Sequence, residues 1–127
     1  MRYLTALTAA ALAAGLSLPA LAEGDAAAGE KVYNRCKSCH AVGEGARNRV
    51  GPQLNGIVGA EIASVDGFKY SKAFMDKKAE GLVWTEQALA AFLEKPRGYI
   101  PRTRMSFGGL NKEEDRVNVI AYMKTFK

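Results

Sequence analysis

Apolar residues recur at helical spacing in the second half of the chain. Leu89, Phe92 and Leu93 share one face of a predicted helix that begins after Thr85 and continues to Lys95. Thr85 has the side chain of a good N-cap, and the proline that follows Lys95 is a typical stop signal. This segment is therefore a strong helix candidate with a buried face.

The C-terminal segment has a broader apolar stripe. Val117, Ile120 and Ala121 lie on one side of a second predicted helix. Asn111 and Glu114 are spaced like a capping box and mark its expected start.

Two further helices are predicted earlier in the chain. One covers Ala26 to about Cys36, with Asp25 as its N-cap. The other covers Lys72–Lys78 and begins after Ser71. Gly29 lies inside the first helix, where glycine costs stability, so we expect another element to pass close to it.

The remaining segments are rich in turn-forming residues and have no periodic pattern of apolar positions. Residues 42–67 and 97–110 contain closely spaced glycine, proline and asparagine, and no stretch alternates as a strand would. The pattern predicts an all-α domain with long loops. Long loops in a compact domain need a reason, and a large cofactor wrapped by the chain is one.

The N-terminus reads as an export signal. Arg2 precedes an apolar run over residues 4–18, and residues 20–22 form a small-residue cleavage site. A membrane anchor is the alternative, but the run is short for a span. We expect residues 1–22 to be a secretory signal peptide cleaved after Ala22, which places residues 23–127 outside the cytosol as one domain.

The composition fits a single small globular domain. The chain has 127 residues, of which 48% are hydrophobic and 24% charged, and its net charge is +5. The positive charge favours an acidic partner. Nucleic acid is disfavoured, because the chain is expected to be exported and has few aromatic residues free for stacking.

Cys36, Cys39 and His40 carry the most specific chemistry. Two cysteines separated by two residues and followed directly by histidine form the attachment motif for a c-type haem. A zinc site and a thioredoxin-like pair are the alternatives. Zinc would lack ligands, and no strand-helix-strand pattern surrounds the cysteines. These are also the only two cysteines and the only histidine.

The second axial position of an iron bound at His40 has several candidate ligands, namely methionine, lysine, water or none. Met75 and Met123 lie in helical patterns, where methionine usually fills a core. Met105 lies in an irregular segment distant from Cys36 and is the preferred candidate. Histidine–methionine ligation raises the potential and suits an electron carrier.

Other residues can complete such a pocket. The carbonyl of Pro52, in a rigid turn, would accept a hydrogen bond from the second ring nitrogen of His40. Four residues have polar tips on bulky or loop-held side chains: Tyr70, Trp84, Tyr99 and Thr103. In a haem pocket tryptophan and tyrosine can fill volume and donate hydrogen bonds to buried propionates. Core packing with a satisfied polar tip is the alternative for Tyr70 and Trp84.

Basic residues flank the haem motif and the Met105 segment. A charge run is usually a solvated face, but a positive rim would steer an acidic partner to one haem edge. We call six of these residues the basic rim: Arg35, Lys37, Arg49, Arg97, Arg104 and Lys112. Arg47 and Arg102 lie in the same two segments.

Together these features resemble class I cytochromes c of the small bacterial periplasmic type, similar to mitochondrial cytochrome c. The resemblance covers nearly all of residues 25–127. Its landmarks are Gly29 and Tyr33, Cys36–His40, Gly51-Pro52-x-Leu54-x-Gly56, Gly67-Phe68-x-Tyr70-Ser71, Trp84-Thr85, Leu93-x-x-Pro96-x-x-Tyr99-Ile100-Pro101, Thr103-x-Met105-x-Phe107 and Ile120-Ala121-Tyr122.

The resemblance implies a fold in which the terminal helices cross at Gly29 near Tyr122. It implies one covalent haem c with His40 and Met105 as axial ligands. Pro52 would accept from His40, and Tyr70 and Trp84 would bond a propionate. Thr103 and Phe92 would lie on the methionine side, with Phe107 over the exposed haem edge.

The function implied is that of a monomeric electron carrier, not an enzyme. A membrane quinol-oxidising cytochrome complex would be the donor, and a cytochrome oxidase or photosynthetic reaction centre the acceptor. A fixed subunit of one membrane complex is a weaker alternative.

The chain departs from the family pattern at two positions. Ala60 stands where an arginine near a propionate is common, and Arg102 stands where glycine usually follows the loop proline. Arg102 would be strained if its backbone needed a positive φ. It keeps open a second reading, a gas-binding or peroxidase-like haem protein with an open sixth site.

Overall fold

A computed structural model describes residues 10, 15 and 23–127. The expected signal peptide and its cleavage site after Ala22 lie outside the described residues, apart from those two isolated positions. The described chain has five helices and no strand longer than an isolated bridge between Glu61 and Val83. In order they are α1 (Ala26–Tyr33), α2 (Lys72–Ala79), α3 (Glu86–Glu94), α4 (Pro96–Tyr99) and α5 (Glu113–Lys124).

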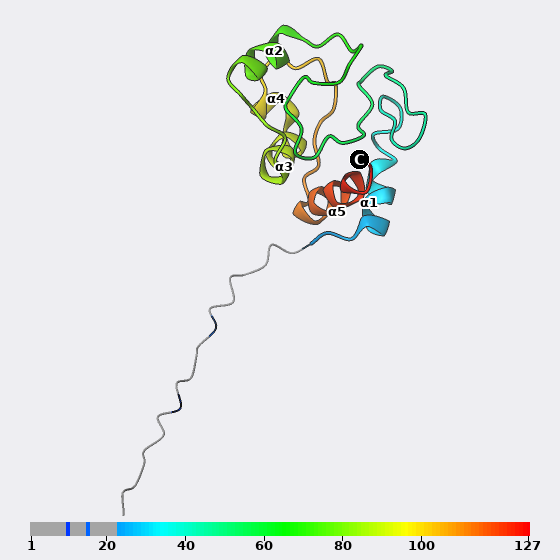
Figure 1. Cartoon of the computed structure of the whole chain (residues 1–127), viewed down its shortest axis with the longest axis vertical. Helices are drawn as coiled ribbons and strands as arrows, with labels where there is room; N and C mark the ends of the chain where they lie inside the picture. The colour runs from blue at the N-terminus through cyan, green and yellow to red at the C-terminus, as the bar shows by residue number, and fades with distance from the viewer. Residues whose placement is uncertain (1–9, 11–14, 16–22) are drawn as a thin grey trace, which may run out of the picture.

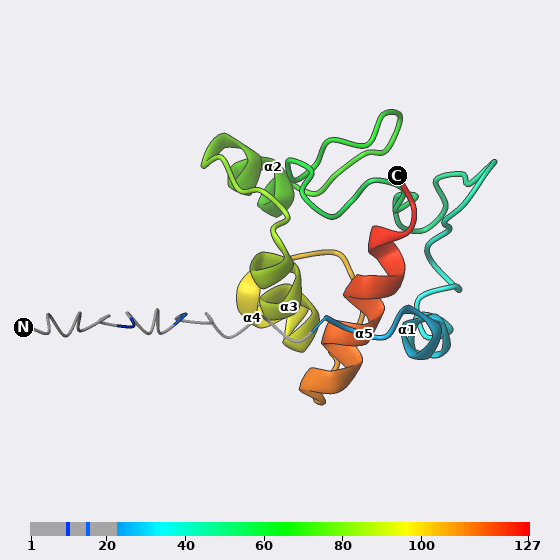
Figure 2. The same ribbon diagram turned by 60° about the horizontal axis from the view of Figure 1, so that its bottom comes forward.

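The first and last helices lie side by side (Figures 1 and 2). At Gly29 the two backbones are so close that an added Cβ would overlap the carbonyl group of Asn118 and lie 2.9 Å from the Cβ of Tyr122. The backbone N–H of Asp25 also donates to Asn118 Oδ1 at 2.8 Å. The predicted close approach at Gly29 is confirmed. Asn118 is buried at this crossing, where its side chain accepts the hydrogen bond from Asp25.

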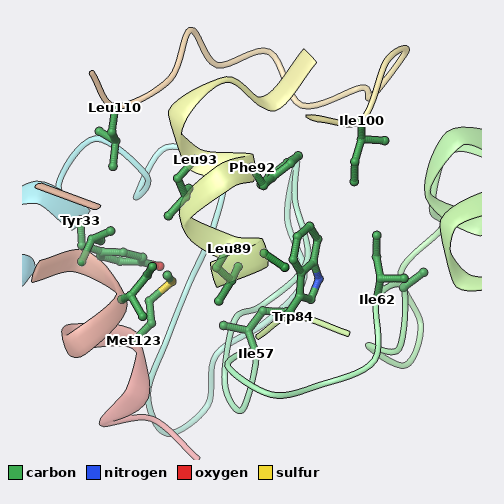
Figure 3. Close-up of a cluster of buried hydrophobic side chains, with 14 residues drawn as sticks. Tyr33, Ile57, Ile62, Trp84, Leu89, Phe92, Leu93, Ile100, Leu110 and Met123 are labelled. Carbon is green, nitrogen blue, oxygen red and sulfur yellow. The ribbon is translucent and has the colours of Figure 1, made fainter. Parts of the chain in front are cut away.

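Aromatic rings fill the space between α1 and α5. The ring centroids of Tyr33 and Tyr122 are 5.4 Å apart, and those of Tyr122 and Phe126 are 5.0 Å apart. Tyr33 is only 1% exposed, and its ring points toward Met123 (Figure 3). Its hydroxyl finds no hydrogen-bond partner among the described protein atoms, and burial raises the pKa of Tyr33 to about 12.

Helix α3 supplies the other wall of the core (Figure 3). Thr85 accepts a hydrogen bond from the N–H of Ala88 at 3.0 Å, as an N-cap should. Leu89, Phe92 and Leu93 are all buried, which confirms the predicted apolar face. Trp84 packs on Phe92, with 5.1 Å between ring centroids.

The long loops are tied by scattered backbone hydrogen bonds. Gly59 donates to the carbonyl of Trp84 at 2.7 Å, and Trp84 donates to that of Ala60 at 2.8 Å. Gly56 donates to the carbonyl of Phe126 at 2.8 Å, which joins the first loop to the end of the chain. These pairs hold irregular backbone in place without a sheet.

The start of α5 differs from the prediction. The helix begins at Glu113, and its N-cap Lys112 makes no side-chain cap, so the predicted capping box of Asn111 and Glu114 is wrong. Three acidic residues occupy the first turn instead, where negative charge complements the helix dipole.

Three smaller expectations also need correction. Regular α-helix α1 ends at Tyr33 and gives way to turns before Cys36. Pro96 ends α3 but also begins the short helix α4, because proline fits a first helical position, so the segment after it is not wholly irregular. Met75 is 47% exposed and fills no core, whereas Met123 is buried as expected.

Among the helices of the described residues, none is long and apolar enough to cross a membrane.

Replacing Gly29 by Ala is expected to lower the free energy of unfolding by about 1 to 3 kcal/mol, because the new methyl group overlaps the Asn118 carbonyl and forces α1 and α5 apart. Urea unfolding followed by far-UV circular dichroism measures the change. Glu30→Gln, at an exposed neighbouring position, is the control and should shift stability by less than about 0.5 kcal/mol. An unchanged Gly29→Ala protein would contradict the close crossing.

Candidate haem-binding site

The segment after α1 brings two thiols and one imidazole onto consecutive turns. Cys36 donates to the carbonyl of Tyr33 at 2.8 Å, and both Cys39 and His40 donate to the carbonyl of Cys36 at 3.1 and 2.9 Å. Both cysteines are free and half-buried, and burial raises the pKa of the Cys36 thiol. No group of three or more His, Cys, Asp or Glu side chains suited to a metal ion occurs in the described part of the chain.

His40 is held by the turn at Pro52. Its Nδ1 lies 2.7 Å from the Pro52 carbonyl oxygen, an acceptor that requires a proton on Nδ1. Burial lowers the pKa of His40, and the Pro52 hydrogen bond opposes that shift only partly. The imidazole is therefore neutral near pH 7, and its Nε2 lone pair is available to a metal.

Gly51 makes this arrangement possible. A Cβ at Gly51 would lie 2.8 Å from both ring nitrogens of His40, so only glycine lets the turn approach the imidazole. The N–H of Gly51 also donates to the carbonyl of Cys39 at 2.9 Å. The turn thus contacts the haem motif through its backbone and through the histidine ring.

Met105 lies in a loop between α4 and α5. Its side chain is half-buried and packs against the core, and its N–H donates to Thr103 Oγ1 at 3.2 Å. Thr103 is itself buried, and its N–H donates to the carbonyl of Ile100 at 3.1 Å. Arg102 has φ +66°, the left-handed conformation that the missing glycine would adopt without strain.

The predicted propionate donors retain donor capacity. The Tyr70 hydroxyl accepts from the N–H of Val65 at 3.0 Å, which leaves its own proton to donate, and burial raises the Tyr70 pKa. The Trp84 side chain is buried, with 4% of its surface exposed. Tyr99 is half-buried against the core.

A hollow of about 520 Å³ is lined by residues of the first long loop, between Ala46 and Asp66. Ala60 and Val65 are both in its wall, and they are the residues whose backbones pair with Trp84 and Tyr70. Arg47 and Asp66 also line it.

All six residues of the basic rim are exposed. Two of them also make contacts within the chain. Arg49 donates from Nη1 to the carbonyl of Lys37 at 2.9 Å, and the guanidinium carbon of Arg35 lies 5.3 Å from the centroid of the Phe107 ring.

Comparisons with known proteins agree on one family. The family model described as cytochrome c matches residues 26–127. The chain is 52% identical to cytochrome c2 of Afifella marina over 100 residues, covering 79% of this chain and 81% of that protein. It is 48% identical to cytochrome c-554 of Methylosinus trichosporium over 126 residues, covering 99% and 91%.

The chain belongs to the cytochrome c family. The structure of cytochrome cH from Methylobacterium extorquens superimposes with a TM-score of 0.73 at 41% identity, covering 80% of this chain and 99% of that one. The all-α cytochrome c fold is thereby confirmed, and the cofactor is one covalently attached haem c. Family membership makes the chain an electron carrier.

The described site fits this cofactor. Two free thiols and a neutral imidazole with an available Nε2 are the donor set that covalent haem attachment requires. Tyr70 adds a hydroxyl that accepts from Val65 and keeps its own proton to donate, and Trp84 adds an indole N–H on a buried side chain. Cys36, Cys39 and His40 of this cytochrome are therefore suited to hold the haem.

Sequence reasoning missed two asparagines that join the loops. Asn48 donates from Nδ2 to the carbonyl of Asp66 at 2.9 Å and accepts from the N–H of Gln53 at 3.0 Å. Asn55 exchanges two hydrogen bonds of 2.8 Å with the backbone of Gly43. Asparagine in a glycine-rich loop is a signal for such side chain-to-backbone bonds, but it does not identify the partners.

Gly51→Ala is expected to displace the His40 imidazole, because the methyl group would overlap its ring. We expect a loss of about 1 to 3 kcal/mol in unfolding free energy and an altered spectrum of the reduced haem protein. Denaturant unfolding and visible absorption measure both effects. Gly108→Ala, whose Cβ would meet nothing within 4 Å, is the matched control. Equal behaviour of the two variants would contradict the role of Gly51.

Proposed function

We propose that this cytochrome is a periplasmic carrier of single electrons whose haem iron is ligated by His40 and Met105, and that it has no enzymatic activity of its own. The supporting observation is the pairing of His40 Nδ1 with Pro52, which fixes a neutral imidazole with Nε2 free. The half-buried Met105, positioned by Thr103 in a separate loop, supports the second ligand.

Haem c supplies an iron that cycles between two oxidation states. The chain's own residues tune that cycle. Cys36 and Cys39 tether, and Pro52 keeps the imidazole basic and oriented by accepting its Nδ1 proton. The thioether of Met105 would ligate the haem iron, favour its reduced state and keep oxygen from binding it. Tyr70 and Trp84 would hold the haem propionates by donating hydrogen bonds to them.

Met105→Ala is expected to abolish the long-wavelength sulfur-to-iron band of the oxidised protein. The reduction potential should fall by at least about 59 mV, a tenfold change in a one-electron equilibrium. Visible spectroscopy and a redox titration measure these effects. Met75→Ala is the control, because Met75 is an exposed methionine on α2 and should leave both unchanged.

One observation favours a second function. Residues 100–112, which join α4 to α5 and contain Met105, are called the ligand loop. Arg102 at φ +66° strains the ligand loop, and a strained loop could leave the sixth site open for a gas or a peroxide. Carbon monoxide added to the reduced wild-type protein separates the two functions. Slow or absent binding supports the electron carrier. Rapid binding, or a wild-type protein without the sulfur-to-iron band, would refute Met105 ligation.

The partners follow from charge and from the proposed export. Residues 1–22 act as a signal peptide cleaved after Ala22, and the released chain works as a monomer in the periplasm. The donor is a membrane quinol-oxidising cytochrome complex, and the acceptor is an oxidase or a photosynthetic reaction centre. The six exposed cations of the basic rim support an acidic docking surface on each.

The rate of electron transfer to membranes of the encoding organism should fall about tenfold or more as the ionic strength rises from about 0.01 to 0.15 M. The reason is that the Debye screening length falls from about 30 to about 8 Å over this range, which weakens the attraction between the basic rim and an acidic partner. Stopped-flow absorption measures the rate.

Lys37→Glu should slow the low-salt reaction and flatten the salt dependence. Lys72→Glu makes the same change in net charge on α2, outside the basic rim, and should have a smaller effect. Equal slowing by both variants would show that net charge, and not the rim, controls docking.

A further inference from the structure

Arg35 and Phe107 connect the haem-attachment segment to the ligand loop. Arg35 immediately precedes Cys36, and Phe107 is two residues after Met105. The guanidinium carbon lies 5.3 Å from the ring centroid, within the range of a cation–π contact. The contact therefore spans two segments that are more than seventy residues apart.

The Arg35 guanidinium forms no ion pair with an acidic side chain among the described residues. Three ion pairs occur among the described residues, Lys72–Asp76, Lys77–Glu80 and Lys124–Glu86, and none includes Arg35. Phe107 in turn is half-buried and packs against the core. The Phe107 ring thus contacts the Arg35 guanidinium as well as the hydrophobic core.

Backbone pairing contributes little to holding the middle of the ligand loop. No backbone–backbone hydrogen bond involves residues 104–109 in the part of the chain that the structure describes. The loop is held at its ends, where Thr103 donates to Ile100 and Leu110 donates to Leu93 at 2.7 Å. Arg102 adds strain at one of those ends. Side-chain contacts must therefore keep the middle of the loop closed.

We propose that Arg35 is a clasp for the ligand loop, and that its stacking on Phe107 holds Met105 in its closed position. Arg35 is then a positioning residue and not only a docking cation. A planar guanidinium can stack on a ring in a way that the compact ammonium of lysine cannot. This inference rests on the proposed ligation by Met105.

The test measures how often the loop opens. Imidazole is added to the oxidised holoprotein at fixed pH, and its capture is followed by loss of the sulfur-to-iron band. Arg35→Gln is expected to speed capture about two- to fivefold, the equivalent of an exposed cation–π contact. Arg35→Lys, which keeps the charge, should also speed capture.

Lys31→Gln is the matched control, because it removes the same charge from an exposed side chain in the last turn of α1, outside both the basic rim and the haem-attachment motif. It should leave the capture rate at the wild-type value. Equal acceleration by Arg35→Gln and Lys31→Gln would refute the clasp and assign the effect to charge. An Arg35→Lys protein with the wild-type rate would refute it as well.

A double-mutant cycle isolates the contact itself. In a Phe107→Leu background, Arg35→Gln should produce no further acceleration. A full additional effect would overturn the proposal. A wild-type protein that has the band but is unaffected by the Arg35 variants refutes only the clasp, whereas a wild-type protein without the band refutes Met105 ligation and the clasp together.

Discussion

The backbone contact between α1 and α5 is the constraint on which the site depends. At Gly29 the two helices approach closely enough to exclude even a methyl group, and the Asp25–Asn118 hydrogen bond fixes their register. Since Cys36 to His40 continue directly from the end of α1, the crossing also determines where the haem-attachment residues lie relative to the core. The contact between the first and last helices thus positions the haem-attachment residues.

Local signals in the sequence were sufficient for most of the framework. Helix faces such as Leu89, Phe92 and Leu93 follow from periodicity, and the caps at Asp25, Ser71 and Thr85 follow from side-chain chemistry. Cys36, Cys39 and His40 could be assigned because covalent chemistry fixes their spacing. The all-α class followed from the same patterns, because no segment alternated as a strand does.

The features that were missed depend on partners distant in the chain. The helical pattern around Met75 did not show that its side chain is exposed, and the spacing of Asn111 and Glu114 did not show that α5 begins at Glu113. The pairing of Arg35 with Phe107 and the bond of Asn48 to Asp66 join residues that only the fold brings together. Arg35 and Phe107 could be singled out from the sequence, but the contact between them could not.

The Asn48 junction has a consequence for how the two halves of the first long loop respond to acidity. Its amide donates to one half and accepts from the other, and an amide has no proton to gain or lose over the ordinary pH range. A histidine or a carboxylate in the same place would weaken or rearrange the junction as it titrated. With asparagine, the two halves stay joined while the acidity of the surroundings changes.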